Sequence, residues 1–201
     1  MSPDLEQELL AAAAVLRAGG LVAYPTETFY GLGARARDAA AVARLARAKG
    51  RSDGKPLPLL AADRAQVESV AELAGPAATL AARLWPGALT LVLPALPGLP
   101  EEITAGTGTV AVRVPGSEVA RALAAAVGEP IVSTSANLAG EPPPASAAEL
   151  SPELVARLDR VLDGGPTPGG APSTLVVFEG TAIRLLRAGA VPWEDVRAAA
   201  R

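Results

Sequence analysis

The chain has 201 residues, of which half are apolar and 19% are charged, as in globular proteins with a buried core. It contains neither cysteine nor histidine, which excludes disulfides, Ser-His and Cys-His nucleophile pairs and zinc sites of the usual kind. The net charge of -3, together with only two Trp, two Tyr and two Phe, argues against a general nucleic-acid-binding protein.

The N-terminus and the apolar runs bear on location. The chain begins M-S-P-D-L-E, which is acidic and unlike a signal peptide. No apolar run reaches the roughly 20 residues that a membrane-spanning helix needs. We therefore expect a cytoplasmic protein without a membrane segment. Since there is no internal repeat and no long linker, we expect a single domain over residues 1–201.

A helix is predicted first, capped by Ser2 and stopped by two glycines at residues 19–20. Residues 21–24 then read as a buried strand that ends at Pro25. The sequence P-T-E-T-F-Y-G-L-G follows at residues 25–33. Its Thr26, Glu27 and Thr28 lie at a strand end, where α/β proteins usually bind ligands. The pattern alone nevertheless favours a hydrogen-bonded turn, and G-L-G is too short for a dinucleotide fingerprint.

A basic loop, K-G-R-S-D-G-K-P at residues 49–56, follows the second predicted helix. Lys49 and Lys55 are the two lysines of a chain whose other basic residues are all arginine. With Arg51 between them they suit a polyanion such as a triphosphate, and two glycines let the backbone come close. A solvated basic turn at a helix C-terminus fits the same stretch equally well.

The remaining segments alternate between helical and strand patterns, which predicts an α/β fold. We expect further helices to start at Asp38, Asp63 (reaching about residue 73), Pro76, Ser117, Ser151 and Pro192. We expect strands over residues 57–61, 89–93, 109–114 and 131–132, and a hairpin of residues 174–178 and 182–186. Residues 94–108 and 163–172 are rich in Pro and Gly and are expected to be loops.

Two polar features interrupt these strands. Arg113 falls on the opposite face of its strand from Val112 and Val114. It is either at a solvated strand end or directed at an anionic ligand, and both interpretations fit. The sequence S-T-S-A-N at residues 133–137 places small hydroxyl and amide groups directly after a strand. Such groups line a polar pocket or, more commonly, make Asx and Ser/Thr turns.

Taken together, these stretches resemble the YrdC-like family, the threonylcarbamoyl-AMP synthases, over about residues 19–189. The resemblance rests on A-Y-P-T-E-T-F-Y-G-L-G (23–33), K-G-R with K-P (49–56), L-W-P-G-A-L-T (84–90), T-V-A-V-R-V-P (109–115), S-T-S-A-N-L-A-G (133–140), P-S-T (172–174) and R-A-G (187–189). Two departures are clear. Ser52 stands where a proline is common, and there is no histidine near Leu60, where some members have one.

The resemblance implies an α/β fold with a single three-layer domain, in which a twisted open mixed sheet is flanked by helices around a basic central cavity. It implies an enzyme that joins L-threonine, bicarbonate and ATP into threonylcarbamoyl-AMP and releases pyrophosphate. A separate tRNA threonylcarbamoyl transferase would receive the product and modify adenosine 37 of ANN-decoding tRNAs. Since the chain ends soon after R-A-G, we expect the short form without the extra C-terminal domain.

The motifs then suggest roles for individual residues. Lys49 and Arg51 are the expected catalytic cations, and Lys55 would help them to hold the triphosphate with Mg²⁺. Arg113 would hold the threonine carboxylate or the carbamate, and Thr26 would position the amino acid. No metal site built from side chains alone is expected. The expected ATP-binding set is Lys49, Arg51, Lys55, Thr109, Ser135, Asn137, Ser173 and Arg187.

Two rival functions stay open at this point. The same type of domain occurs in enzymes that handle carbamoyl phosphate, although those rely on additional domains. A non-catalytic factor that docks RNA in the basic cavity is the second rival, and a weak RNA contact is also compatible with the enzyme. The acidic balance and the scarcity of aromatic residues weigh against the RNA-binding factor.

Overall fold

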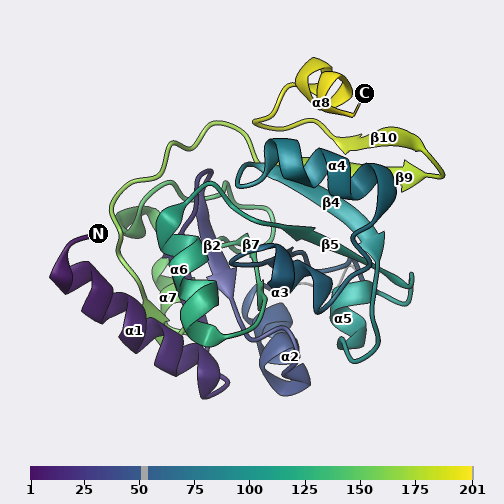
Figure 1. Cartoon of the computed structure of the whole chain (residues 1–201). Helices are drawn as coiled ribbons and strands as arrows, with labels where there is room; N and C mark the ends of the chain where they lie inside the picture. The colour runs from purple at the N-terminus through teal and green to yellow at the C-terminus, as the bar shows by residue number, and fades with distance from the viewer. Residues whose placement is uncertain (51–53, 201) are drawn as a thin grey trace.

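Strands from both halves of the chain lie at the centre of the molecule, and helices cover them (Figure 1). This computed structural model describes residues 1–50 and 54–200. The helices are α1 (Pro3–Arg17), α2 (Ala39–Ala48), α3 (Arg64–Glu68), α4 (Gly75–Leu84), α5 (Glu101–Thr104), α6 (Glu118–Val127), the short 3-10 helix η1 (Ala147–Glu149), α7 (Pro152–Val155) and α8 (Trp193–Ala199). The strands are β1 (Val22–Pro25), β2 (Tyr30–Gly33), β3 (Leu59–Leu60), β4 (Leu89–Pro94), β5 (Thr109–Arg113), β6 (Ile131–Val132), β7 (Thr134–Ser135), β8 (Arg160–Val161), β9 (Thr174–Glu179) and β10 (Ala182–Arg187).

Side-chain caps begin five of these helices, as the sequence predicts. In each case a hydroxyl or carboxylate oxygen accepts a hydrogen bond from a backbone N–H of the first turn, at 2.9–3.3 Å. Such caps satisfy backbone donors that have no partner within the helix. The capping residues are Ser2, Asp38, Asp63, Ser117 and Ser151.

The strands form two mixed sheets that share one segment of chain. One sheet has the order β7-β2-β1-β8 and the other β10-β9-β4-β5-β3-β6. Residues 131–135 run from one sheet into the other, since β6 pairs with β3 and β7 pairs with β2. At the junction the Val132 N–H donates to Ala34 O at 2.8 Å. The expected α/β architecture with a mixed sheet and flanking helices is confirmed, with the sheet divided at this junction.

Helices pack in pairs on these sheets (Figure 1). At the N-terminal side α1 lies against α6, and both contact β1. At the C-terminal side α4 lies against α8 and covers β4, while α2 lies against α5. Across residues 1–50 and 54–200, none of the helices is both long and apolar enough to cross a membrane.

Strand β2 was missed by the sequence analysis, which expected only a turn before the G-L-G. In the antiparallel register Tyr24 lies opposite Gly31, and the ring of Tyr24 is fully buried. A Cβ atom built on Gly31 would lie 3.2 Å from Tyr24 Cζ, and one on Gly33 would lie 2.8 Å from Tyr24 Cε1. The two glycines therefore leave the space that the aromatic ring occupies, which is why a strand here contains them.

Three further elements differ from expectation. Helix α3 ends at Glu68 rather than near residue 73, because Ala71 forms a β-bridge with Ala95 and the Glu72 N–H donates to Pro94 O. The expected loop of residues 94–108 contains the single-turn helix α5. The two-residue strand β8, parallel to β1, is too short to show a periodic pattern in the sequence.

The substitution Gly33→Ala should lower the free energy of unfolding by about 1–3 kcal/mol, the usual cost of overpacking a filled core. The backbone of Gly33 is not left-handed, so steric conflict with Tyr24 is the expected cause. Urea unfolding of the variant measures the loss. The same substitution in a Tyr24→Leu background should cost much less, and an equal cost in both backgrounds would contradict this explanation.

Candidate active site

The segment between β1 and β2 is a closed turn, as the sequence pattern favours. Thr26 Oγ1 donates to Phe29 O at 2.7 Å and accepts from the Thr28 N–H at 3.2 Å. Both threonines are buried. A Cβ atom on Gly116 would lie 3.4 Å from Glu27 Cβ, so the chain after β5 packs closely over the turn. The turn therefore fixes the position from which Glu27 projects, and the role of Thr26 in binding an amino acid stays a prediction.

Arg113, at the end of β5, forms a buried ion pair with Glu27. Its Nε atom donates to Glu27 Oε1 at 3.1 Å, and the two side chains are only 8% and 14% exposed. The alternative that Arg113 marks a solvated strand end is therefore wrong. Arginine is rarely buried without a partner, and here the partner is a carboxylate that comes from the other sheet.

The P-S-T and R-A-G motifs meet beside this pair. Arg187 donates from Nε and Nη2 to Ser173 O at 3.2 and 2.8 Å, and from Nη2 to Ser173 Oγ at 3.1 Å. Ser173 Oγ is also hydrogen-bonded to Thr90 Oγ1 at 2.8 Å. A Cβ atom on Gly189 would lie 2.5 Å from the backbone of Ser173. This close approach of the two segments of the chain aligns Arg187 with Ser173.

The charges of this cluster do not balance. Arg187 is exposed as a residue, but partial burial of its guanidinium lowers its pKa below the ordinary value, and the positive charge of Arg113 lowers that pKa further. The two guanidinium groups are thus close enough to repel each other. Glu27 supplies one negative charge to them, which leaves a local surplus of one positive charge. A surplus of positive charge beside a buried arginine suits the binding of an anion.

Tyr24 lies near Glu27, Arg113 and Ser133. Its hydroxyl donates to Val132 O at 3.3 Å. Burial raises the pKa of Tyr24 to about 12, while a hydrogen bond with Ser133 and the charge of Arg113 act in the opposite direction. Tyr24 is therefore a neutral hydrogen-bonding group at all physiological pH values.

Lys49 lies at the C-cap of α2 with its side chain buried. Its Nζ atom donates to the backbone oxygens of Ser135 and of Asn137, the latter at 2.9 Å, and lies 3.4 Å from Asn137 Oδ1. The amide of Asn137 donates to Leu138 O at 2.9 Å and to Glu141 O at 2.7 Å. Three of the predicted site residues thus come together, with Asn137 closing a turn as one of the two alternatives proposed.

The other predicted residues are placed differently. Arg51 lies outside the described residues. Lys55 is exposed and lines a cavity of about 460 Å³ together with Leu57 and Glu102. Thr109 is hydrogen-bonded to Thr107 at 2.8 Å. It lies at the opposite end of β5 from Arg113, about 13 Å along the strand. The structure does not bring Thr109 to the Arg113 cluster.

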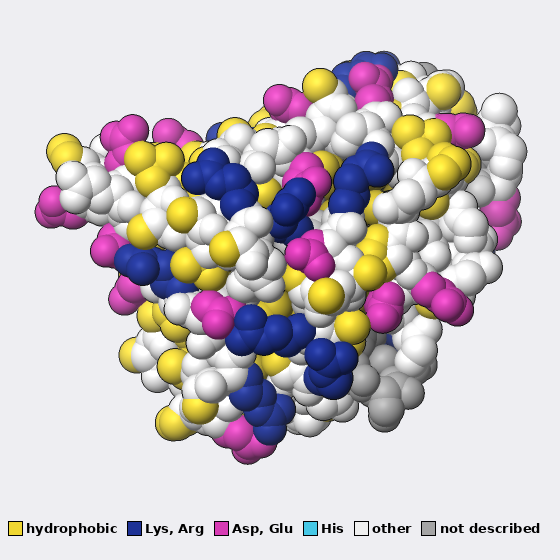
Figure 2. Space-filling view, turned by 90° about the horizontal axis from the view of Figure 1, so that it is seen from below, with side chains coloured by type: hydrophobic (Ala, Val, Ile, Leu, Met, Phe, Trp, Pro, Cys, Tyr) yellow, Lys and Arg dark blue, Asp and Glu magenta, His cyan; other side chains and the backbone are white. Residues whose placement is uncertain are grey.

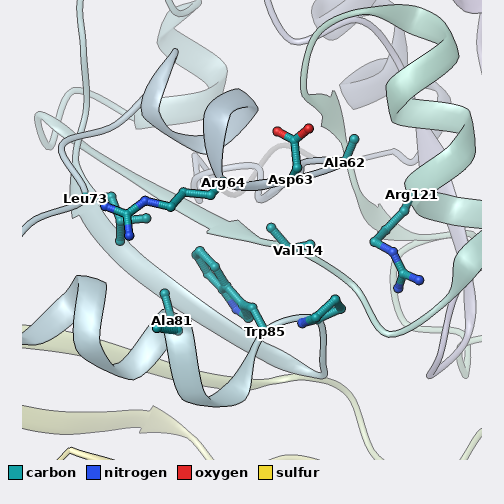
Figure 3. Close-up of a pocket in the computed structure, with 10 residues that line it drawn as sticks. Ala62, Asp63, Arg64, Leu73, Ala81, Trp85, Val114 and Arg121 are labelled. Atoms are coloured by element: carbon teal, nitrogen blue, oxygen red, sulfur yellow. The ribbon is translucent and has the colours of Figure 1, made fainter.

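A second cavity, of about 310 Å³, lies on the other face of β5 (Figure 3). The ring of Trp85 projects into it between Ala81 and Val114, and its lining is mainly apolar. Since Val114 and Arg113 are successive residues of an extended chain, their side chains point to opposite faces. This cavity is therefore separate from the charged cluster.

Two buried polar residues near the site, Thr90 and Ser133, were not among the individually predicted site residues, although Ser133 belongs to the S-T-S-A-N stretch. Thr90 is 2% exposed within an apolar strand, and Ser133 is 6% exposed at the sheet junction. A polar residue in an apolar strand was the signal that drew attention to Arg113, and the same signal marks Thr90. In the described ranges there is no group of three or more Asp, Glu, His or Cys placed to hold a metal ion.

A family model named Sua5_yciO_yrdC, with the description "Telomere recombination", matches residues 14–189. The chain belongs to this family. It is 43% identical over 198 residues to a threonylcarbamoyl-AMP synthase of Bacillus subtilis, and this match covers 96% of the chain. It is 46% identical over 162 residues to a protein of the same name from Stenotrophomonas maltophilia, covering 79% of the chain and 87% of that protein.

Among solved structures the chain is similar to the crystal structure of Pyrococcus abyssi Sua5 complexed with L-threonine. The two share 42% sequence identity with a TM-score of 0.92, over 96% of the chain. The chain spans 57% of that Sua5 chain and 56% of the Bacillus protein, a little over half the length of each.

The phenol of Tyr24 should titrate far above the ordinary value near pH 10. The unfolded chain releases this proton first as pH rises, so stability should fall between about pH 10 and 12, by roughly 1 kcal/mol per pH unit. The variant Tyr30→Phe leaves Tyr24 as the one tyrosine, and its tyrosinate absorbance measures the titration. Ionisation near pH 10 in a chain still folded by circular dichroism would contradict the burial of this hydroxyl.

Proposed function

We propose that this chain is an L-threonylcarbamoyl-AMP synthase. It joins L-threonine, bicarbonate and ATP, and releases pyrophosphate. The observation that carries the proposal is the cluster of the buried Arg113 and the more exposed Arg187 with a single carboxylate, in a chain 43% identical to an enzyme of this name. The activity of the longer relatives is extended to this chain as part of the proposal.

The chemistry explains why cations are concentrated here. The threonine amine reacts with bicarbonate and releases water, or with CO2 and releases a proton, and either reaction gives a carbamate. A carbamate oxygen then attacks the α-phosphorus of ATP, and the bond to the departing pyrophosphate breaks. Two anions must meet, and the leaving group gains charge. Fixed positive groups and correct placement are the main contributions that a protein makes to such a step.

We assign the residues as follows. Arg113 binds the threonine carboxylate, and Arg187, held by Ser173, faces a phosphate group or the adenine. The triphosphate is bound by Lys49, Arg51 and Lys55, of which Arg51 lies outside the described residues. Mg²⁺ enters with ATP as part of the substrate, because it binds chiefly through phosphates and water. No covalent enzyme intermediate is required.

The product is a mixed anhydride that a second enzyme must consume. We propose that a tRNA threonylcarbamoyl transferase takes it for adenosine 37 of ANN-decoding tRNAs. A weak contact with RNA is compatible with this. On the face seen from below α2, basic side chains stand in separate groups with acidic ones between them (Figure 2). Arg44 of α2 is paired with Asp159, and Arg35, which precedes α2, is paired with Glu129. This mixed pattern of basic and acidic side chains does not favour a protein whose role is only to bind RNA.

Pyrophosphate release with each substrate omitted in turn tests the reaction directly. The wild-type chain should release pyrophosphate only when L-threonine, bicarbonate and ATP are all present. Replacing threonine and bicarbonate by carbamoyl phosphate should abolish turnover. Turnover with carbamoyl phosphate alone would support the rival enzyme class. RNA binding at physiological salt without any threonine-dependent turnover would support the non-catalytic rival.

Lys49→Ala and Arg51→Ala should each reduce threonine-dependent pyrophosphate release by at least about 100-fold, on the scale of a lost charge contact in a transition state. The matched control is Arg64→Ala, which removes an exposed arginine paired with Glu68 four residues along α3. The control should keep wild-type turnover. If both lysine and arginine variants fold and turn over normally, these two residues are not the catalytic cations.

A further inference from the structure

The carboxylate of Glu27 uses only one of its oxygens within the described chain. Oε1 accepts from Arg113, whereas Oε2 is buried and accepts no hydrogen bond from residues 1–50 or 54–200. A buried charged oxygen without a donor is costly, and native proteins keep few of them. A functional role, such as accepting a hydrogen bond from a ligand, is one explanation for such an atom.

Arg113 has a matching unused edge. Its hydrogen bond runs from Nε to Glu27, and its two Nη atoms donate to nothing in the part of the chain that the structure describes. The Nη edge of a guanidinium fits a carboxylate with two parallel hydrogen bonds. A ligand carboxylate bound there lies beside the Glu27 carboxylate, because both are held by the same guanidinium group.

The charges around this edge favour a zwitterion over a simple anion. A ligand carboxylate is attracted by Arg113 and by the neighbouring Arg187, but it is repelled by Glu27. An ammonium group next to that carboxylate removes the repulsion and provides the donor that Oε2 lacks. An α-amino acid has these two groups on one carbon atom. The geometry of the Glu27–Arg113 pair thus matches the backbone end of an amino acid.

We propose that Glu27 determines specificity for an α-amino acid, with Oε2 accepting a hydrogen bond from the amino group while the Nη atoms of Arg113 bind the carboxylate. This rests on the proposed function, for which the amino acid is L-threonine. The carbamate formed from the amine still carries one N–H, so the same contact persists after the amine has reacted. Glu27 then orients the carbamate oxygens away from itself and toward the nucleotide.

Two ligands and two proteins test this role. The ligands are L-threonine and (R)-3-hydroxybutanoate, which keeps the carboxylate and hydroxyl but lacks the amine. The proteins are the wild type and Glu27→Gln, in which an amide oxygen still accepts from Arg113 Nε. We expect Glu27→Gln to weaken threonine binding by at least about 10-fold, the scale of a charge-assisted hydrogen bond. The same substitution should strengthen 3-hydroxybutanoate binding or leave it within about 2-fold, because it removes the repulsion between the two carboxylates.

Kinetics provide a second readout. The KM for threonine should rise at least about 10-fold in Glu27→Gln, while the KM for ATP stays within about 2-fold. Glu153→Gln, which removes an exposed carboxylate paired with Arg157, should match the wild type in both. Arg113→Lys should weaken both ligands alike, because it removes the carboxylate contact that they share.

Three results would overturn the inference. Equal loss of both ligands in Glu27→Gln would mean that Glu27 only positions Arg113, and unchanged threonine affinity would mean that it does neither. In both cases threonine-dependent pyrophosphate release by the wild type would leave the proposed function standing. A wild-type chain that neither binds threonine nor releases pyrophosphate would instead refute the proposed function, and this inference with it.

Discussion

The site depends on one buried ion pair, between Glu27 and Arg113, that joins the two sheets. Glu27 follows β1 of the four-stranded sheet, and Arg113 ends β5 of the six-stranded sheet. Removing two charges from water costs several kcal/mol per ion, and their mutual attraction often fails to recover it. A pair of apolar residues would hold the sheets together at least as well. The persistence of charge here therefore points to a role in binding, and the neighbouring Arg187 increases the electrostatic cost that a ligand can relieve.

The surrounding structure serves to hold this pair still. Tyr24 lies near this pair, and the absence of side chains at Gly31 and Gly33 leaves space for the tyrosine ring. Residues 131–135 run from one sheet to the other and place Ser133 beside the tyrosine and Ser135 against Lys49. The S-T-S-A-N motif thus contacts both Tyr24 of the first motif and Lys49 of the basic loop, although the three are distant in sequence. The apolar cavity around Trp85 lies on the opposite face of β5 and takes no part in it.

Much of this fold could be predicted from the sequence because local signals set it. Asp38 has the side chain and the position of an N-cap, and it begins α2 as expected. Strand β2 could not be predicted, because its glycines are explained only by the ring of Tyr24 on the neighbouring strand. The early end of α3 could not be predicted either, because the backbone groups of Ala71 and Glu72, just after the helix, pair with residues at the end of β4. The site shows the same division. Arg113 stands out in the sequence as a charged residue in an apolar strand. Its pairing with Glu27 and the contact between Ser173 and Arg187 could not be predicted, because they depend on tertiary structure.

The central claim is that the buried Arg113 and the neighbouring Arg187 form one anion-binding centre. NMR spectra of the arginine Nε–H groups, assigned with Arg113→Lys and Arg187→Lys, test it most directly. On addition of L-threonine and a non-hydrolysable ATP analogue, the resonances of Arg113 and Arg187 should shift, whereas that of Arg184, which is paired with Glu179 on the β9–β10 hairpin, should not. Bound ligands that leave the resonances of both Arg113 and Arg187 unmoved would contradict the account.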